Sequence, residues 1–247
     1  RGLAGPPTRA RAAIVELPAG LLGPAAGESG DAGTPAGDAV PSVRWATRGF
    51  DDARSPRWMS GGDRIVFVAP SDPRVHPDRV ERRILASSSG QGLEVRPLVD
   101  LPDWTVGRPR PGPGNRLAFA ARRMDHPSDR QWKVGLVDLD EVELPVRDAA
   151  DVQWLTDTES FDHSVRGLAW HAGRVLLTAA VRGGFPLCAA SPGLLEPTVL
   201  VGERDGFPVG VHAFGAGGGT IAWAETHPTA PSVLRVRAGD RDLLVHD

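Results

Sequence analysis

The sequence predicts an all-β fold, a partial β-propeller of about four four-stranded blades preceded by a half-blade. One pattern recurs four times along the chain: a strand, a tight turn and a buried apolar strand. Further short strand-like runs follow each copy, so that each unit can form a four-stranded meander. No stretch shows the apolar period of an amphipathic helix of convincing length.

The first 47 residues are expected to form the half-blade. Strand-like runs occupy residues 12–17 and 43–47, and the second, Val-Arg-Trp-Ala-Thr, resembles Val-Gln-Trp-Leu-Thr at 152–156. Residues 18–42 are rich in Gly, Ala and Pro and offer little large apolar surface to offset the entropy of ordering. This composition favours a flexible surface loop.

Residues 48–247 are expected to form the blades, at about 48–102, 103–160, 161–206 and 207–247. The first strand of each copy ends at Trp58, Arg110, Trp170 or Phe214, and these positions are 52, 60 and 44 residues apart, near the range of propeller repeats. Second strands are expected at 65–69, 117–121, 175–181 and 221–224. Third strands are expected at 83–86, 133–139, 187–190 and 233–236, and fourth strands at 93–99, 152–156, 198–201 and 243–245.

Composition excludes some partners. The 28 basic and 31 acidic residues leave a net charge of -3, which gives no electrostatic reason to expect nucleic acid or an anionic membrane. No run approaches a membrane span, and the N-terminus lacks the pattern of a signal peptide. Cys188 is the only cysteine and lies in an apolar run, so it is expected to be a buried small residue in a cytoplasmic protein without internal disulfides.

The repeats resemble those of a known family. Trp-x-x-Gly-Gly-Asp-Arg-Ile-Val-Phe-Val at 58–68, Pro-Gly-Pro-Gly-Asn-Arg-Leu-Ala-Phe-Ala at 111–120, Trp-Leu-Thr at 154–156 and Leu-Ala-Trp at 168–170 are similar to the propeller repeats of the prolyl oligopeptidase (S9) serine peptidases. The acylaminoacyl-peptidase and dipeptidyl-peptidase-like branch is the nearest in pattern, and TolB-type propellers share the repeat. The resemblance covers about residues 43–247.

Two features depart from the family pattern. The turn that usually reads Ser-Pro-Asp-Gly is replaced by sequences such as Ser60-Gly61-Gly62-Asp63, so the turns should form with less local reinforcement. The family also carries an α/β-hydrolase domain whose serine sits on a G-x-S-x-G elbow, and this chain contains no such motif. The chain is therefore expected to be a fragment whose catalytic domain lies elsewhere in a longer parent protein.

Several groups of side chains have residue types found in functional sites, but none is expected to be catalytic, cofactor-binding or metal-binding. The acidic loop with Asp157, Glu159, Asp162 and His163 offers hard ligands, but it lacks the glycine and spacing of a calcium loop and is expected to be solvated. Together with Ser160 and Ser164, the same loop has the residue types of a hydrolase triad, but adjacent residues rarely converge in the required geometry. The Gly-rich run 215–219 is expected to be a β-turn rather than a phosphate loop.

The positions of the tryptophans and of several arginines lead to two further predictions. Trp45, Trp58, Trp154, Trp170 and Trp223 are expected to pack between blades, whereas Trp104 and Trp132 are expected to line a surface. Arginines near strand ends are most often salt-bridged surface residues. The resemblance implies the alternative that some face a central channel and contact the peptide substrate; the candidates for this role are Arg108, Arg110 and Arg166.

The resemblance implies a non-catalytic, substrate-gating role, in which the propeller limits access to short peptides while a C-terminal α/β-hydrolase domain of the same parent protein cleaves them. The partners expected are that domain and short peptides, with no cofactor, nucleic acid or membrane. The alternative function is a stand-alone TolB-like or WD40-like propeller that acts as a protein-interaction scaffold.

Overall fold

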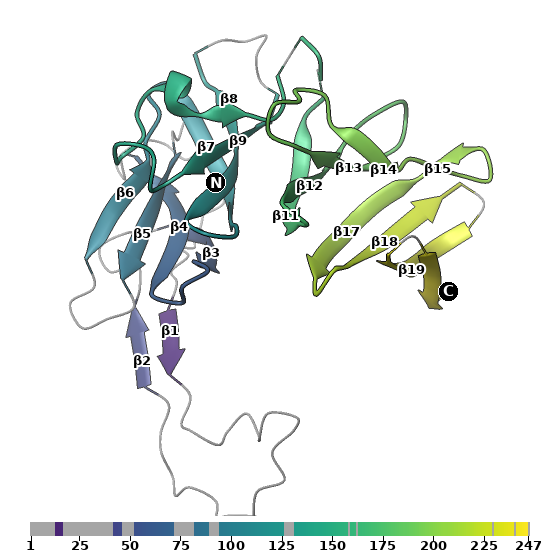
Figure 1. Ribbon diagram of the computed structural model, residues 1–247, viewed down its shortest axis with the longest axis horizontal. Coiled ribbons are helices and arrows are strands. Elements are labelled where there is room, and N and C mark those ends of the chain that lie inside the picture. Colours follow the sequence, from purple (N-terminus) through teal and green to yellow (C-terminus); the bar gives the residue numbers. More distant parts are fainter. Residues whose placement is uncertain are drawn as a thin grey trace, which may run out of the picture.

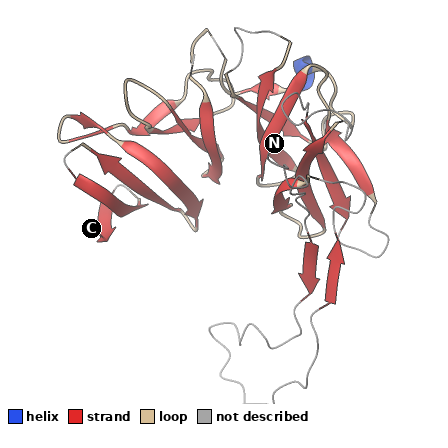
Figure 2. Cartoon of the chain, turned by 180° about the vertical axis from the view of Figure 1, so that it is seen from behind, coloured by secondary structure: helices blue, strands red, loops and turns tan. Residues whose placement is uncertain are grey.

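The chain folds almost entirely into antiparallel strands (Figure 2). The structure is a computed structural model that describes residues 13–16, 42–45, 52–71, 82–88, 94–125, 131–157, 159–161, 163–228, 230–239 and 241–246. Helix in this described part is limited to one 3-10 turn, Ala149–Asp151. None of the helical structure within it is long and apolar enough to cross a membrane.

Four four-stranded sheets make up the body of the described chain (Figure 1). In each sheet, strands that are consecutive in sequence are hydrogen-bonded neighbours, which is the meander that the repeats predicted. The first sheet contains β3 (Arg54–Trp58), β4 (Arg64–Pro70), β5 (Arg82–Ser88) and β6 (Val95–Val99). The second contains β7 (Trp104–Pro111), β8 (Arg116–Arg123), β9 (Lys133–Asp138) and β10 (Gln153–Trp154).

The third sheet contains β11 (Val165–His171), β12 (Arg174–Ala179), β13 (Leu187–Ala190) and β14 (Thr198–Val201). The fourth contains β17 (Gly210–Gly217), β18 (Thr220–His227), β19 (Ala230–Ala238) and β20 (Arg241–His246). The all-β, partial-propeller fold class is confirmed. The expected strands overlap the observed ones in all sixteen positions of the four sheets.

The first strands of successive sheets contact one another. β7 lies against β3 on one side and β11 on the other, and β11 lies against β17. The sheets follow one another along an arc (Figure 1), so β3, β7, β11 and β17 form the inner side of the array. A ligand on the axis of such an array meets these four inner strands before any others.

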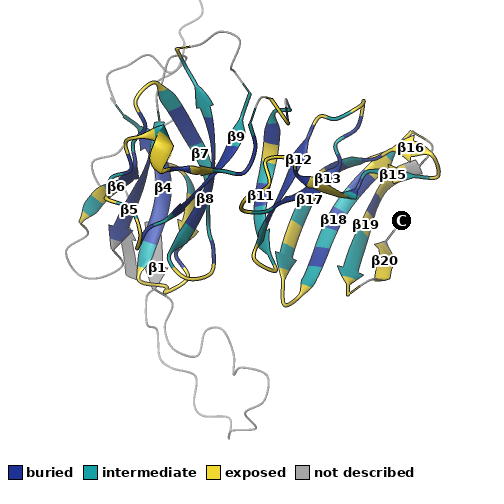
Figure 3. Ribbon diagram, turned by 45° about the horizontal axis from the view of Figure 1, so that its top comes forward, coloured by how far each residue is buried: buried dark blue, intermediate teal, exposed yellow. Residues whose placement is uncertain are grey.

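Apolar clusters fill the spaces between neighbouring sheets. Phe119 of β8 is fully buried among residues of the first and second sheets, Leu177 of β12 is buried among residues of the second and third, and Trp223 of β18 is buried among those of the third and fourth. Because the middle strands are covered on both faces, they are apolar along most of their length. Figure 3 shows this burial concentrated in the middle of the sheets.

The turns between first and second strands have the backbone that the glycines predicted. Ala172-Gly173 joins the paired residues His171 and Arg174, and both turn residues have positive φ, 47° and 77°. Gly218-Gly219 makes the same kind of two-residue turn, with φ of 56° and 77°. Positive φ at both positions is the two-residue hairpin geometry that matches strand twist. The Gly-rich run 215–219 thus contains the expected β-turn at Gly218-Gly219, and its residues 215–217 belong to strand β17.

Two small hairpins accompany the four sheets. β1 (Ala13–Glu16) pairs with β2 (Ser42–Trp45), so the two strands expected in the half-blade are partners of each other. Of the loop expected at 18–42, all but Ser42 lies outside the described residues. The second hairpin, β15 (Glu203–Arg204) with β16 (Phe207–Pro208), was not expected from the sequence and lies between the third and fourth sheets in the chain.

The tryptophans correct two expectations. Trp104 does not line a surface: its ring stacks on Trp154 with centroids 4.9 Å apart, beside the core between the first two sheets. Trp58 is 50% exposed rather than packed between sheets. Trp170 does pack between sheets, because its indole covers Gly112 and its Nε1 donates to the Arg110 carbonyl at 2.7 Å. The side chain of Trp45 lies outside the described residues.

Cys188 gives a simple test of the core. It is fully buried on β13, and burial raises the pKa of its thiol to about 11. At pH 8 we therefore expect no reaction with a thiol reagent such as DTNB in the native protein and one equivalent after denaturation, because only the thiolate reacts. Rapid labelling of the native protein would contradict the third sheet's packing.

Candidate functional site: the inner strands

Each inner strand carries a break in its pairing with the second strand of its sheet. The register shifts between Arg54 and Arg57 on β3, between Gly107 and Arg110 on β7, between Val165 and Gly167 on β11, and between Val211 and Ala213 on β17. A β-bulge of this kind bends its strand and re-aims a side chain, and bulges are over-represented next to active sites. The four bulges fall on the strands that line the axis.

The bulges contain basic residues in three of the four sheets. Arg108, Arg166 and His212 lie at the register shifts of β7, β11 and β17, where the first sheet has Ser55. Ser55 and Arg108 both have positive φ, 52° and 53°, which is strained for residues with a side chain. Backbone strain of this kind persists only where the surrounding fold maintains it. Residues with such strain cluster at functional sites.

The inner strands have charge of one sign. Their sequences, RSPRW, WTVGRPRP, VRGLAWH and GVHAFGAG, contain five arginines and neither aspartate nor glutamate. Arg54 is paired with Asp52 at 2.7 Å. The other four have no carboxylate partner in the described part of the chain; these are Arg57, Arg108, Arg110 and Arg166.

This outcome corrects the expectation of salt-bridged surface arginines at these positions. Arg123, at the end of β8, is by contrast a salt-bridged arginine, because it pairs with Asp125 at 2.5 Å. Arg108 and Arg110 instead bridge two sheets: the Arg108 guanidinium donates to the Val165 carbonyl, and Arg110 Nε donates to the Leu168 carbonyl at 2.6 Å. A guanidinium has five N–H donors, so each of these side chains retains donors for a ligand.

The unpaired arginines are close enough to raise one another's electrostatic energy. Burial lowers the pKa of Arg108, and the neighbouring charge of Arg166 lowers it further. Burial also lowers the pKa of Arg110, with added contributions from Arg57 and Arg108. The four guanidinium groups thus form one coupled positive cluster, which a bound anion would stabilise.

A pocket of about 470 Å³ opens beside this cluster, between β11 and β17. Arg110 and Arg166 line it together with His212, so the structure brings two of the three predicted arginines to one cavity; Arg108 lies next to it. Phe185 supports the Arg166 guanidinium, whose Cζ lies 4.0 Å from the ring centroid. The remaining lining residues are Gly167, Leu168, Thr178, Phe185, Gly210, Val211, Ala213, Phe214 and Thr226.

Trp132 belongs to the same cluster, not to a separate surface. Arg108 and Arg122 each place a guanidinium over its ring, with Cζ 5.2 and 5.1 Å from the centroid. Cation–π contacts hold arginines in place without neutralising their charge. The aromatic rings therefore fix the arginines while leaving the cluster positive.

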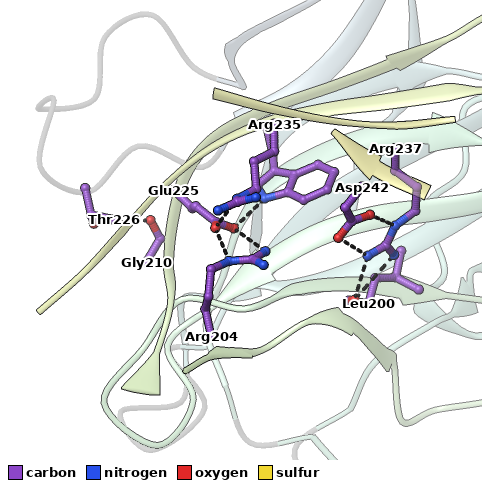
Figure 4. A network of polar contacts seen from close by, with 9 residues as sticks. Leu200, Arg204, Gly210, Glu225, Thr226, Arg235, Arg237 and Asp242 are labelled. Atoms are coloured by element: carbon purple, nitrogen blue, oxygen red, sulfur yellow. Dashed lines mark hydrogen bonds and ion pairs between the residues drawn. The ribbon is translucent and has the colours of Figure 1, made fainter. Parts of the chain in front are cut away.

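A second polar network lies at the junction of the third and fourth sheets (Figure 4). Glu225 on β18 is fully buried and accepts hydrogen bonds from Arg204 Nε at 2.6 Å, Arg235 Nε at 2.7 Å and Trp223 Nε1 at 2.6 Å. Burial alone would raise the pKa of Glu225, but the hydrogen bonds from Arg204 and Trp223 outweigh it, and the pKa is lowered. Because Arg204 belongs to β15 and Glu225 to β18, this network ties the β15–β16 hairpin to the fourth sheet.

Sequence reasoning missed Glu225, although a signal existed. In β18 the alternation Ile221, Trp223, Glu225 places the carboxylate on the buried face, two residues beyond a buried indole. A charged residue at such a position requires buried partners, and the nearby arginines could have been proposed.

The acidic loop has a local structural role. Asp157 accepts hydrogen bonds from Ser160 Oγ at 2.7 Å and from the backbone N–H groups of Ser160 and Glu159, and the bond from the Ser160 hydroxyl is the main cause of its lowered pKa. Asp162 lies outside the described residues. Within the part of the chain that is described, His, Cys, Asp and Glu side chains form no cluster suited to a metal ion. The loop is a turn held together by its own aspartate.

Comparison with known proteins places the fold. No family model matches the sequence, and neither does any curated protein. A puromycin-hydrolysing peptidase from Mycobacterium tuberculosis matches with a TM-score of 0.60 and 16% identity, over 83% of this chain and 30% of that one.

Two further solved structures match over most of this chain. The β-propeller domain of the trilobed protease from Pyrococcus furiosus, described as having an open velcro topology, matches with a TM-score of 0.57 and 14% identity, over 78% of this chain and 51% of that one. TolB from Acinetobacter baumannii matches with a TM-score of 0.56 and 12% identity, over 83% and 46%.

This chain therefore spans about half or less of the length of each of these three proteins. Because the identities are low, the likeness establishes the fold alone. The resemblance found in the repeats is confirmed at that level: the chain is a partial β-propeller of the kind found in S9-type peptidases and in TolB.

Proposed function

We propose that this chain is the non-catalytic, substrate-gating propeller segment of an S9-type serine peptidase. The single observation that carries the proposal is the set of bulged inner strands, which turn Arg108 and Arg166 out of register beside a pocket that Arg110 and Arg166 line. A gate that admits short peptides needs groups on its axis that recognise a charged terminus, and unpaired guanidinium groups bind carboxylates well. The likeness of fold to two peptidases supports this role.

In this proposal the chain binds and admits the substrate, and a C-terminal α/β-hydrolase domain of the same parent protein carries out acyl transfer. Arg108, Arg110 and Arg166 would contact the peptide. The sequence contains no nucleophile elbow of the G-x-S-x-G type, so the reaction is assigned to the partner domain and no catalytic residue is proposed in this chain.

Two measurements test this function. The purified 247-residue chain is expected to bind short peptides without cleaving them. Cleavage of a peptide or acyl-peptide substrate that a serine-directed reagent blocks would contradict the non-catalytic role. In the gene, the coding frame beyond Asp247 is expected to encode a G-x-S-x-G motif followed by Asp and His.

An interaction scaffold of the TolB or WD40 kind is the second candidate. The likeness to TolB favours it, as do the exposed apolar side chains of the last strand, where Leu243, Leu244 and Val245 are each more than half exposed. Exposed apolar patches mark protein-interaction surfaces. A coding frame that ends after further strands, without a hydrolase motif, would favour the scaffold over the gate.

A further inference from the structure

The distribution of charge within the molecule points beyond a generic peptide gate. The whole chain has a net charge of -3, yet the four inner strands hold five arginines and no carboxylate. If the acidic residues were distributed evenly along the chain, the four inner strands would contain some of them. The positive charges gathered on the inner strands create a local electrostatic field that is opposite in sign to the net charge of the whole molecule.

We propose that the inner strands select acidic peptides, and that a side-chain or terminal carboxylate of the peptide binds between Arg110 and Arg166 in the pocket between β11 and β17. The inference deepens the proposed gating function and rests on it. It specifies the substrate class as short peptides with acidic residues, which the fold alone does not indicate.

The pocket geometry is suited to this ligand. Arg166 is exposed, has no hydrogen-bond partner in the described residues, and rests on the ring of Phe185, so its N–H donors are available to a carboxylate. Arg110 is fixed by its bond to Leu168, which limits the entropy lost when an anion binds. Phe185 and Phe214 also line the pocket and provide apolar surface for the rest of the peptide.

The row of arginines explains why more than one acidic residue should matter. Arg57, Arg108, Arg110 and Arg166 come from three consecutive sheets, and their charges interact in sequence from Arg57 to Arg110, Arg108 and Arg166. One carboxylate in the pocket would neutralise part of this cluster, and a second acidic side chain would meet the rest. A peptide with basic residues would be repelled along the same path.

Binding of matched peptides to the 247-residue chain tests the inference. The probes are acetyl-Ala-Glu-Glu-Phe and acetyl-Ala-Gln-Gln-Phe, which have the same shape and the same free C-terminus, with Kd measured by calorimetry at low and at high salt. We expect the Glu peptide to bind about tenfold more tightly at low salt and the preference to shrink at high salt. Equal affinity for the two peptides would overturn the selection of acidic peptides and leave the gating function standing.

Two variants with the same change in net charge locate the site. Arg166→Gln should weaken binding of the Glu peptide about tenfold, whereas Arg241→Gln on β20, exposed and away from the inner strands, should leave it unchanged. An equal loss in both variants would overturn the pocket assignment, because the effect would then be one of net charge. Failure of both peptides to bind the unaltered chain would overturn the gating function together with this inference.

Discussion

Replacement of Glu225 by glutamine is expected to lower the free energy of unfolding by about 3 kcal/mol or more. The change leaves the guanidinium groups of Arg204 and Arg235, 2.6 and 2.7 Å from the carboxylate, facing a neutral amide at a fully buried position. Removal of the carboxylate from a network in which it is fully buried is costly because Arg204 and Arg235, which keep only 23% and 18% of their side-chain surface exposed, lose their shared counter-charge. Urea denaturation followed by tryptophan fluorescence measures the change.

Asp242→Asn is the matched control. Asp242 pairs with Arg237 at 2.5 Å, but both side chains keep about a quarter of their surface exposed, so the cost should stay below about 1 kcal/mol. Equal losses in the two variants would contradict the structural importance of Glu225.

The same network predicts a pH dependence of stability. Because the pKa of Glu225 is lowered on folding, its contribution to stability is present above its ordinary pKa of 4.5 and is lost as the pH falls through the pKa of the folded state.

Gly112→Ala is expected to cost about 2 kcal/mol of unfolding free energy. A Cβ at this position would overlap the Trp170 indole, which cannot move away freely because its Nε1 donates a hydrogen bond to the Arg110 carbonyl. The contact joins the second and third sheets, so the added methyl group must push the two sheets apart or break that bond. Thermal unfolding monitored by circular dichroism measures the loss.

Gly215→Ala provides the comparison for this prediction. Gly215 lies on β17, where an added Cβ meets nothing within 4 Å, so the change should be neutral or slightly stabilising. If both substitutions proved neutral, the close packing of Trp170 on Gly112, and with it the stacking of the second sheet on the third, would be wrong.

The sequence was sufficient to predict the order of strands because each repeat combines two local signals. An apolar run after a glycine turn marks the second strand, and the distance between copies marks the next sheet. β13 is observed at the residues that the pattern predicted, Leu187–Ala190. The ends of other strands, such as β4 at Arg64–Pro70, extend one residue beyond their apolar centre because hydrogen bonding continues after burial ends.

Features that depend on contacts between distant residues could not be predicted. The bulges at Arg108 and Arg166 become visible only when the pairing register of each strand is known. Trp104 was misplaced because its partner Trp154 lies 50 residues away, in the strand that closes the same sheet. The β15–β16 hairpin has no apolar pattern of its own, and it is tied to the fourth sheet by the Arg204–Glu225 ion pair.

For the same reason, only part of the candidate site could be predicted from the sequence. Arg108, Arg110 and Arg166 could be chosen by their places near strand ends, but their lack of acidic neighbours in the described structure is a property of the folded array. Conversely, the absence of Asp and Glu from all four first strands can be read from the sequence once these strands are aligned. That absence distinguishes a positively charged set of inner strands from scattered surface arginines.

Mapping of a bound short peptide by nuclear magnetic resonance tests the central claim most directly. Titration of the isotope-labelled chain with acetyl-Ala-Glu-Glu-Phe is expected to shift the amide signals of Arg110, Arg166 and His212, on three inner strands that line one pocket. Shifts confined to the exposed last strand at Leu243, Leu244 and Val245, with the inner strands unperturbed, would contradict a gate and support an interaction scaffold.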